Sequence, residues 1–170
     1  MIVAPTMLLL AAPATATTWP SADIVASAQV SVSPTEMLAL LVDLPRIGPT
    51  LPRDCVGLWT PGTPSSGVGA TARVRYDMAA MHRKLDLSVT RADDQGQRVI
   101  VDWDHAGNRG FVTRWVVESA EGGSTVTLTT PINPPPWPFT AYYFGAVKPE
   151  WDTCQVAFIA AAAGEAAARR

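Results

Sequence analysis

The stretch "SPTEMLALLVDLPRIGPTLP" (residues 33–52) starts as a carefully capped helix. Ser33 and Glu36 have the spacing of a capping box, in which each side chain accepts a hydrogen bond from the backbone N–H of the other residue. Pro34 stands at the first helical position, where proline is favoured because that N–H needs no partner. The stretch therefore predicts a short helix over 34–42.

Proline then interrupts the same stretch. Pro45 has no N–H and disfavours the helical conformation in the residue before it, so we expect the first helix to end here. Residues 45–52, which contain two more prolines, are expected to form a second short helix or turn. A helix this short gains little from its length, which explains why it is capped firmly.

Alternation of apolar and polar residues is the main pattern in most of the remaining chain. It predicts strands that are buried on one face, over residues 23–32, 54–60, 67–78, 84–92, 98–104, 111–119 and 125–132. The later strands are separated by short turns rich in Gly, Asp and Ser, which favours an antiparallel meander in which sequence neighbours pair.

The C-terminal part has a helical pattern. Residues 139–147 are aromatic and fit a helix or a strand, whereas the chain from Glu150 onward is rich in alanine and free of proline. Trp151, Cys154 and Phe158 recur at helical spacing, so one face of this long helix is expected to be buried.

Composition limits the function classes. The chain has 170 residues, of which 48% are hydrophobic and 16% charged, with a formal net charge of −2. These values suit one domain, expected over 23–170, and the absence of a basic patch argues against nucleic acid as a partner. No apolar run is long enough for a stable membrane span, and the sequence does not identify a protein partner.

Residues 1–22 differ from the rest because they contain no charge. The apolar run Met7–Ala12 and the small residues Ala14–Ala16 resemble an export signal, but Lys and Arg are missing before the run. We expect a disordered or mis-started extension and a cytoplasmic location, with export as the alternative. Cys55 and Cys154 are expected to be buried free thiols; the alternative is a long-range disulfide, which needs an oxidising compartment.

Two phrases carry a family resemblance. "VSVSPTEMLALLVDLPRIGPTLP" (30–52) and "GVGATARVRY" (67–76) resemble the opening and the next strand of the START/Bet v 1-like (SRPBCC) superfamily, within it the bacterial polyketide cyclase/dehydrase and lipid-transport group. The resemblance covers about residues 23–168. It departs at Arg46–Gly48, where relatives often carry a tryptophan in the second short helix.

This resemblance implies an α+β helix-grip fold, in which a curved antiparallel sheet wraps around the long C-terminal helix and two short helices follow the first strand. It also implies an apolar cavity between sheet and helix that holds a lipid, polyketide or other hydrophobic small molecule. The two short helices are then expected to close the mouth of that cavity. Some members of the superfamily catalyse cyclisation or dehydration.

Nine side chains on the inward faces are candidates for lining such a cavity, with an ordinary packed core as the alternative. They are Tyr76, Leu87, Trp103, Phe111, Thr113, Trp115, Leu128, Trp151 and Phe158. The available hydrogen-bond donors among them are the phenol of Tyr76, the hydroxyl of Thr113 and the indoles of Trp103 and Trp115.

Candidate catalytic groups are few. His82 is expected to be solvated, and His105 is expected to be a polar residue at a hairpin end. In "DWDH" (102–105) the alternation places Asp102 and Asp104 opposite Trp103 and His105, so the three polar groups do not converge. We predict no catalytic, metal or cofactor residue, and no cofactor. Binding or carriage of a ligand is favoured; the alternatives are a polyketide cyclase/dehydrase using Tyr76 or a histidine as proton donor, and a partner-binding module.

Overall fold

The structure, a computed structural model, describes residues 21–78, 81–106, 111–133, 135–136 and 138–168. Seven antiparallel strands form one sheet in the order β1-β7-β6-β5-β4-β3-β2. The strands are β1 (Ile24–Val30), β2 (Val56–Pro61), β3 (Thr71–Met78), β4 (Met81–Asp94), β5 (Arg98–Ala106), β6 (Phe111–Ala120) and β7 (Gly123–Thr130). The expected meander is confirmed from β2 to β7, because each strand pairs with its neighbours in sequence.

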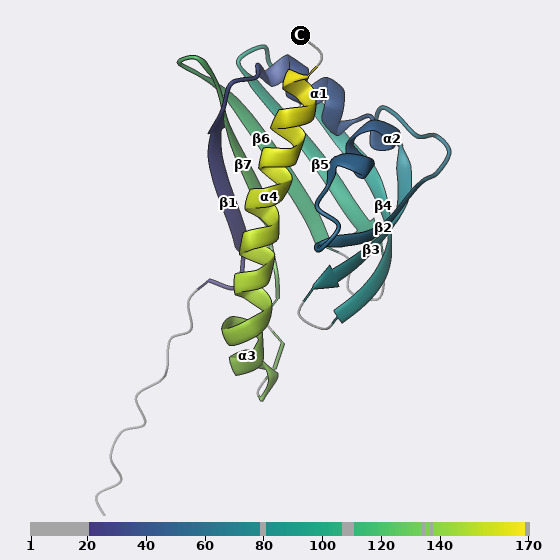
Figure 1. The fold of residues 1–170 in the computed structure, drawn as a ribbon, viewed down its shortest axis with the longest axis vertical. Helices are drawn as coiled ribbons and strands as arrows, with labels where there is room; N and C mark the ends of the chain where they lie inside the picture. Colours follow the sequence, from purple (N-terminus) through teal and green to yellow (C-terminus); the bar gives the residue numbers. More distant parts are fainter. Residues whose placement is uncertain (1–20, 79–80, 107–110, 134, 137, 169–170) are drawn as a thin grey trace, which may run out of the picture.

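Strands β1 and β2 are the two edges of this sheet, although they are consecutive in the chain. The connection between them contains α1 (Pro34–Leu41), α2 (Leu44–Ile47) and the 3-10 turn η1 (Gly48–Thr50). The expected pair of short helices is thus confirmed. The interruption by proline has a clear role, since the chain must cross from one edge of the sheet to the other and change direction on the way (Figure 1).

The capping box of α1 is present. The Ser33 side chain accepts a hydrogen bond from the Glu36 N–H, and the Glu36 carboxylate accepts one from the Ser33 N–H at 2.7 Å. Met37, Leu40 and Leu41 of this helix are fully buried. Cap and apolar face together fix an eight-residue helix that would be unstable alone.

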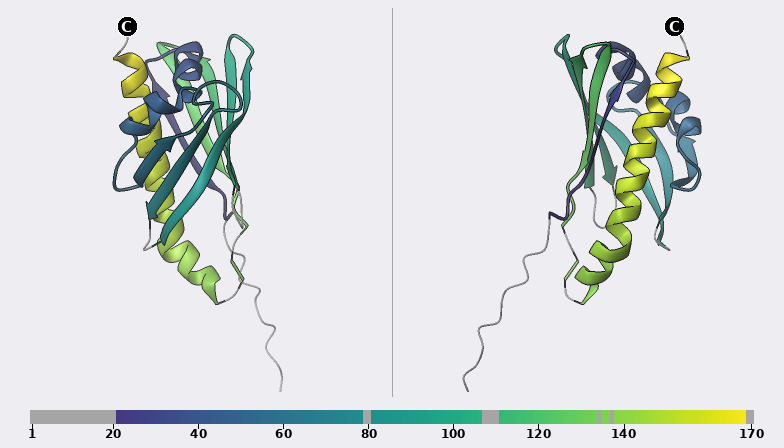
Figure 2. Two further views of the ribbon diagram at one scale, coloured as in Figure 1. Left: turned by 90° about the vertical axis from the view of Figure 1, so that its right-hand side faces the viewer. Right: turned by 60° about the vertical axis from the view of Figure 1, so that its left-hand side comes forward.

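The C-terminal part is helical from residue 139 to residue 167. It consists of α3 (Phe139–Tyr142), the π-helical turn η2 (Tyr143–Val147) and the long helix α4 (Lys148–Ala167). Figure 2 shows the curved sheet with α4 running along its concave side, where the helix contacts β1, β7 and α1. Within the described ranges, no helix is both long and apolar enough to cross a membrane. This arrangement is the helix-grip fold that we expected.

Candidate ligand-binding site

The nine predicted site residues lie where the alternation put them, on the inward side of the sheet and on α4. The eight apolar or aromatic ones belong to one hydrophobic cluster or pack against it. Seven of the nine are buried, namely Tyr76, Leu87, Trp103, Thr113, Trp115, Leu128 and Phe158, and two are half-buried, namely Phe111 and Trp151. That they line a ligand cavity stays a prediction.

One end of the concave face, which we call the α1 end, is filled by packing. Helix α1 contacts β5 and β6, and the Trp103 indole donates a hydrogen bond to the Leu41 carbonyl at 3.0 Å. Trp103 also meets Trp115 edge to face, with ring centroids 5.2 Å apart. The indole N–H of Trp103, which we considered for binding a ligand, is therefore already used by the protein.

The opposite end, which we call the Tyr76 end, is an aromatic cluster. The Tyr76 ring lies 5.4 Å from that of Trp151 and 6.5 Å from that of Phe111, and the last two rings are 5.7 Å apart and nearly perpendicular. Tyr76 is 6% exposed, whereas Phe111 and Trp151 keep more of their surface accessible. The cluster thus extends from the interior to the surface.

His105 belongs to this end, and our expectation of a polar residue at a hairpin end is wrong. Strand β5 runs on to Ala106, so His105 shares the inward face with Trp103 and is fully buried. Its Nε2 lies 2.7 Å from the Tyr76 hydroxyl, and its ring stacks on Phe111 at 4.4 Å. The alternation of residues already indicated this orientation; only the strand end was placed too early.

The hydrogen bonds of His105 determine where its proton sits. The Phe111 carbonyl, 3.3 Å from Nδ1, only accepts hydrogen bonds, so Nδ1 carries the hydrogen. Burial lowers the pKa of His105 from 6.5 to about 4, so the ring is neutral at pH 7 and its Nε2 accepts the hydrogen bond of the Tyr76 hydroxyl. Burial also raises the pKa of Tyr76. Both pKa shifts make transfer of the Tyr76 proton to His105 less favourable, by about 1.4 kcal/mol of free energy for each pKa unit.

Further along the interior lies a second set of polar groups. The hydroxyls of Thr113 and Thr130 are 3.0 Å apart, and the Gln155 amide of α4 donates to Thr130 at 2.7 Å. Gln155 Oε1 and Trp115 Nε1 are buried and have no hydrogen-bond partner within the part of the chain that the structure describes. Buried polar atoms of this kind are uncommon in native proteins, so each calls for a physical explanation.

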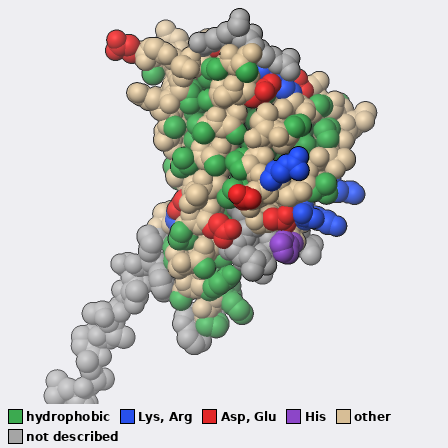
Figure 3. All heavy atoms as spheres, viewed as in Figure 1, with side chains coloured by type: hydrophobic (Ala, Val, Ile, Leu, Met, Phe, Trp, Pro, Cys, Tyr) green, Lys and Arg blue, Asp and Glu red, His purple; other side chains and the backbone are tan. Residues whose placement is uncertain are grey.

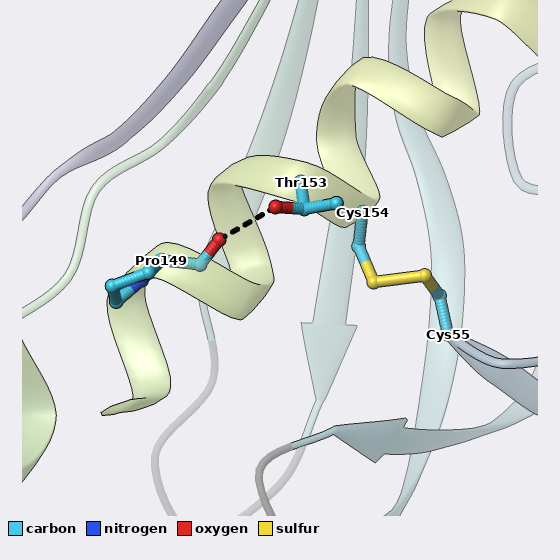
Figure 4. The surroundings of a disulfide bond; sticks show 4 residues. All are labelled: Cys55, Pro149, Thr153 and Cys154. Atoms are coloured by element: carbon cyan, nitrogen blue, oxygen red, sulfur yellow. Dashed lines mark hydrogen bonds between the residues drawn. A yellow bond between two sulfur atoms is a disulfide. The ribbon is translucent and has the colours of Figure 1, made fainter. Parts of the chain in front are cut away.

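The two cysteines form a disulfide, which corrects our preference for free thiols. Cys55, just before β2, is bonded to Cys154 of α4 (Figure 4). The sequence separation of 99 residues gave no sign that the fold brings the two together. The Cys55 carbonyl accepts a hydrogen bond from the Asp77 N–H, and Cys154 lies one helical turn after Trp151. The disulfide therefore joins α4 to the sheet edge beside the Tyr76 end.

The remaining polar residues that we weighed lie outside the concave face. Asp102 accepts two hydrogen bonds from Arg114 on the opposite face, each of 2.8 Å, as the alternation indicated. His82 is exposed, as expected, and its Nδ1 is 2.8 Å from the Asp77 carboxylate; Figure 3 shows such charged groups on the surface. Among the described residues, no three His, Cys, Asp or Glu side chains are grouped so as to hold a metal ion.

An open groove of about 550 Å³ lies over β2, β3 and β4. It is lined by Thr60, Pro61, Gly62, Thr71, Ala72, Arg73, Asp86, Leu87, Ser88 and Ala106. Leu87 is the predicted residue that it includes. The Arg73 and Asp86 side chains on its wall form an ion pair and are about two thirds exposed, so this groove is open to solvent.

A tryptophan does stand beside the second short helix, but it comes from β2. The Trp59 indole donates a hydrogen bond to the Leu44 carbonyl at 2.8 Å. A Cβ atom at Gly48 would overlap the Trp59 ring, so this glycine makes room for it. The absence of tryptophan at 46–48 is thus compatible with aromatic packing at this point.

No protein-family model and no curated protein matches the chain at a significant level. Several solved structures do match the chain. The KanY protein is 18% identical, with a TM-score of 0.66, over 88% of this chain and 99% of that one. The major latex-like protein 151 of Panax ginseng is 11% identical, with a TM-score of 0.56, over 86% and 95%. DynU16, a putative protein in the dynemicin biosynthetic locus, is 14% identical, with a TM-score of 0.52, over 85% of this chain and 47% of its own.

At these identities the likeness shows the fold. A major latex-like protein and a protein from a biosynthetic locus thus share this arrangement of sheet and helix.

Proposed function

We propose that this protein binds or carries a hydrophobic small molecule, lipid- or polyketide-like, between the concave face of the sheet and α4. The aromatic cluster at the Tyr76 end supports this proposal most. Three aromatic rings from β3, β6 and α4 meet there, and two of them are only half-buried. An apolar ligand covering these rings gains roughly 25 cal/mol for each Å² removed from water, before the costs of binding.

The structural neighbours support the same proposal at a coarse level. One of them, DynU16, is a putative protein in the dynemicin biosynthetic locus. The neutral Tyr76–His105 pair favours binding over a cyclase or dehydrase, because acid–base catalysis works best with a group whose pKa is near the working pH. A module that binds a protein partner and no small molecule is the remaining alternative, and the following experiment distinguishes it.

The test is native mass spectrometry of the protein from its own cells, followed by organic extraction and by titration with a fluorescent hydrophobic probe. We expect a co-purifying apolar molecule or probe binding in the micromolar range. Trp151→Ala should weaken probe binding severalfold because it removes one of the three rings. Val156→Ala is the matched control, since Val156 lies on the same helix but is 54% exposed. If no small molecule co-purifies and no probe binds, the proposal is wrong.

The disulfide supports a location in an oxidising compartment, because such bonds persist there and are rare in the cytosol. We therefore favour export over the cytoplasmic location expected from the sequence. The prediction for residues 1–22 lies mostly outside the described residues.

A further inference from the structure

The Tyr76–His105 pair has a consequence for the kind of ligand that fits, if the proposed binding function is correct. Because Nδ1 of His105 donates to the Phe111 carbonyl, Nε2 is left as an acceptor, and the Tyr76 hydroxyl must donate to it. The single hydrogen of the phenol is thereby used inside the protein. Its oxygen keeps lone pairs, and no second partner contacts it within the described residues.

From this geometry we infer that the Tyr76–His105 pair is an acceptor-only anchor, which selects an aromatic ligand carrying a hydroxyl group over the same ligand without a hydrogen-bond donor. The Tyr76 oxygen accepts the hydrogen of the ligand hydroxyl, while Phe111 and Trp151 contact its ring. The inference rests on the proposed function and makes it more specific.

The burial of His105 strengthens this anchor. One face of its ring stacks on Phe111, and at the ring edge Nε2 meets the Tyr76 hydroxyl while Nδ1 meets the Phe111 carbonyl, so the ring cannot rotate without losing these hydrogen bonds. Burial keeps the ring neutral, and a neutral ring is what makes Nε2 an acceptor.

The second polar set agrees with a hydroxylated ligand. Gln155 Oε1 is a buried acceptor and Trp115 Nε1 a buried donor, both without partners among the described residues. A hydroxyl group donates and accepts, so it satisfies either atom. An ether or a ketone accepts only, and it would leave both Tyr76 and Gln155 without a donor, which is costly in an apolar interior.

The experiment compares 2-naphthol with 2-methoxynaphthalene, which has the same rings but no donor, by calorimetry or tryptophan quenching at pH 7. We expect the wild-type protein to prefer the naphthol about tenfold, as for one hydrogen bond in a buried site. Tyr76→Phe removes the phenol oxygen but leaves Nε2 of His105 as a free acceptor, so only the double variant Tyr76→Phe/His105→Leu, which removes both acceptors, should bring the ratio near one by weakening naphthol binding. His105→Leu should also lower the ratio, but by strengthening methoxynaphthalene binding, because the Tyr76 hydrogen is then free to be donated to the ether oxygen.

Tyr143→Phe is the matched control. It removes another buried phenol hydroxyl, which donates to the Ala22 carbonyl and not to His105, so it should leave the ratio unchanged. His105→Leu alone, which should strengthen methoxynaphthalene binding, keeps the test valid if the double variant does not fold. If the wild-type protein binds both compounds equally, the anchor is wrong and the binding function stands. If it binds neither compound and no other probe, both proposals are wrong.

Discussion

At the α1 end, fully buried side chains of α1 fill the space between the sheet and the helices, and the Arg46 guanidinium of α2 is 2.9 Å from the Glu165 carboxylate of α4. At the Tyr76 end, half-buried rings lie around a polar pair, and one covalent bond between Cys55 and Cys154 holds α4 to the sheet edge. Packing stabilises the first end and a disulfide stabilises the second. The comparison indicates that a cross-link between α4 and the sheet edge can hold together an end whose aromatic rings are only half-buried.

The largest effect should come from removing the disulfide. The double variant Cys55→Ala/Cys154→Ala removes a cross-link between two residues that are 99 positions apart in the sequence. Because the unfolded chain then loses this constraint, the unfolding free energy should fall by about 4 kcal/mol. Urea denaturation of the variant, and of the wild-type protein with and without reductant, measures it. Reductant should change the wild-type midpoint but not that of the variant. Equal midpoints for all samples would show that the bond does not hold the Tyr76 end.

The next effect concerns the α1 end. Leu40→Ala removes a fully buried side chain of α1 and should lower the unfolding free energy by about 3 kcal/mol, because it leaves a cavity in a packed region. Leu58→Ala is its control, since Leu58 is 39% exposed and should cost less than about 1 kcal/mol. Similar losses for both variants would contradict the claim that packing stabilises this end.

A smaller effect is expected from the titration of His105. Its pKa is about 4 when folded and 6.5 when unfolded, so below pH 6.5 the unfolded chain binds a proton that the folded protein does not. Stability should therefore fall as the pH decreases from 6.5 towards 4, by about 2 kcal/mol at pH 5 relative to pH 8.

Thermal melts or urea titrations at a series of pH values measure this slope. His105→Gln should flatten it, whereas His82→Gln, at an exposed position, should not. An unchanged slope in His105→Gln would mean that His105 is not kept neutral by burial at the Tyr76 end.

Local patterns predicted most of the fold. The capping box at Ser33, the alternation in the strands and the stripe through Trp151 and Phe158 are all short-range signals, and the helices and strands follow them. The position of His105 was almost predicted, because its inward orientation follows from alternation and only the last two residues of β5 were assigned to the turn.

What the sequence could not predict depends on contacts between distant residues. Cys55 and Cys154 carry no local signal for pairing, since only the way α4 crosses the sheet brings them together. The contact of Trp59 with Gly48 and the hydrogen bond from Tyr76 to His105 likewise join separate elements. Single-sequence patterns fix the face on which a side chain lies, but not its partner across the core.

The same disulfide also changes how the molecule responds to a pulling force. If the chain is stretched from its ends, tension passes through the bond from Cys55 to Cys154 and bypasses β2 to β7. Only the segments outside this loop can be drawn out, so the maximum extension should be roughly 250 Å, against roughly 600 Å for the reduced chain. The strands that carry most of the aromatic cluster are therefore shielded from mechanical load.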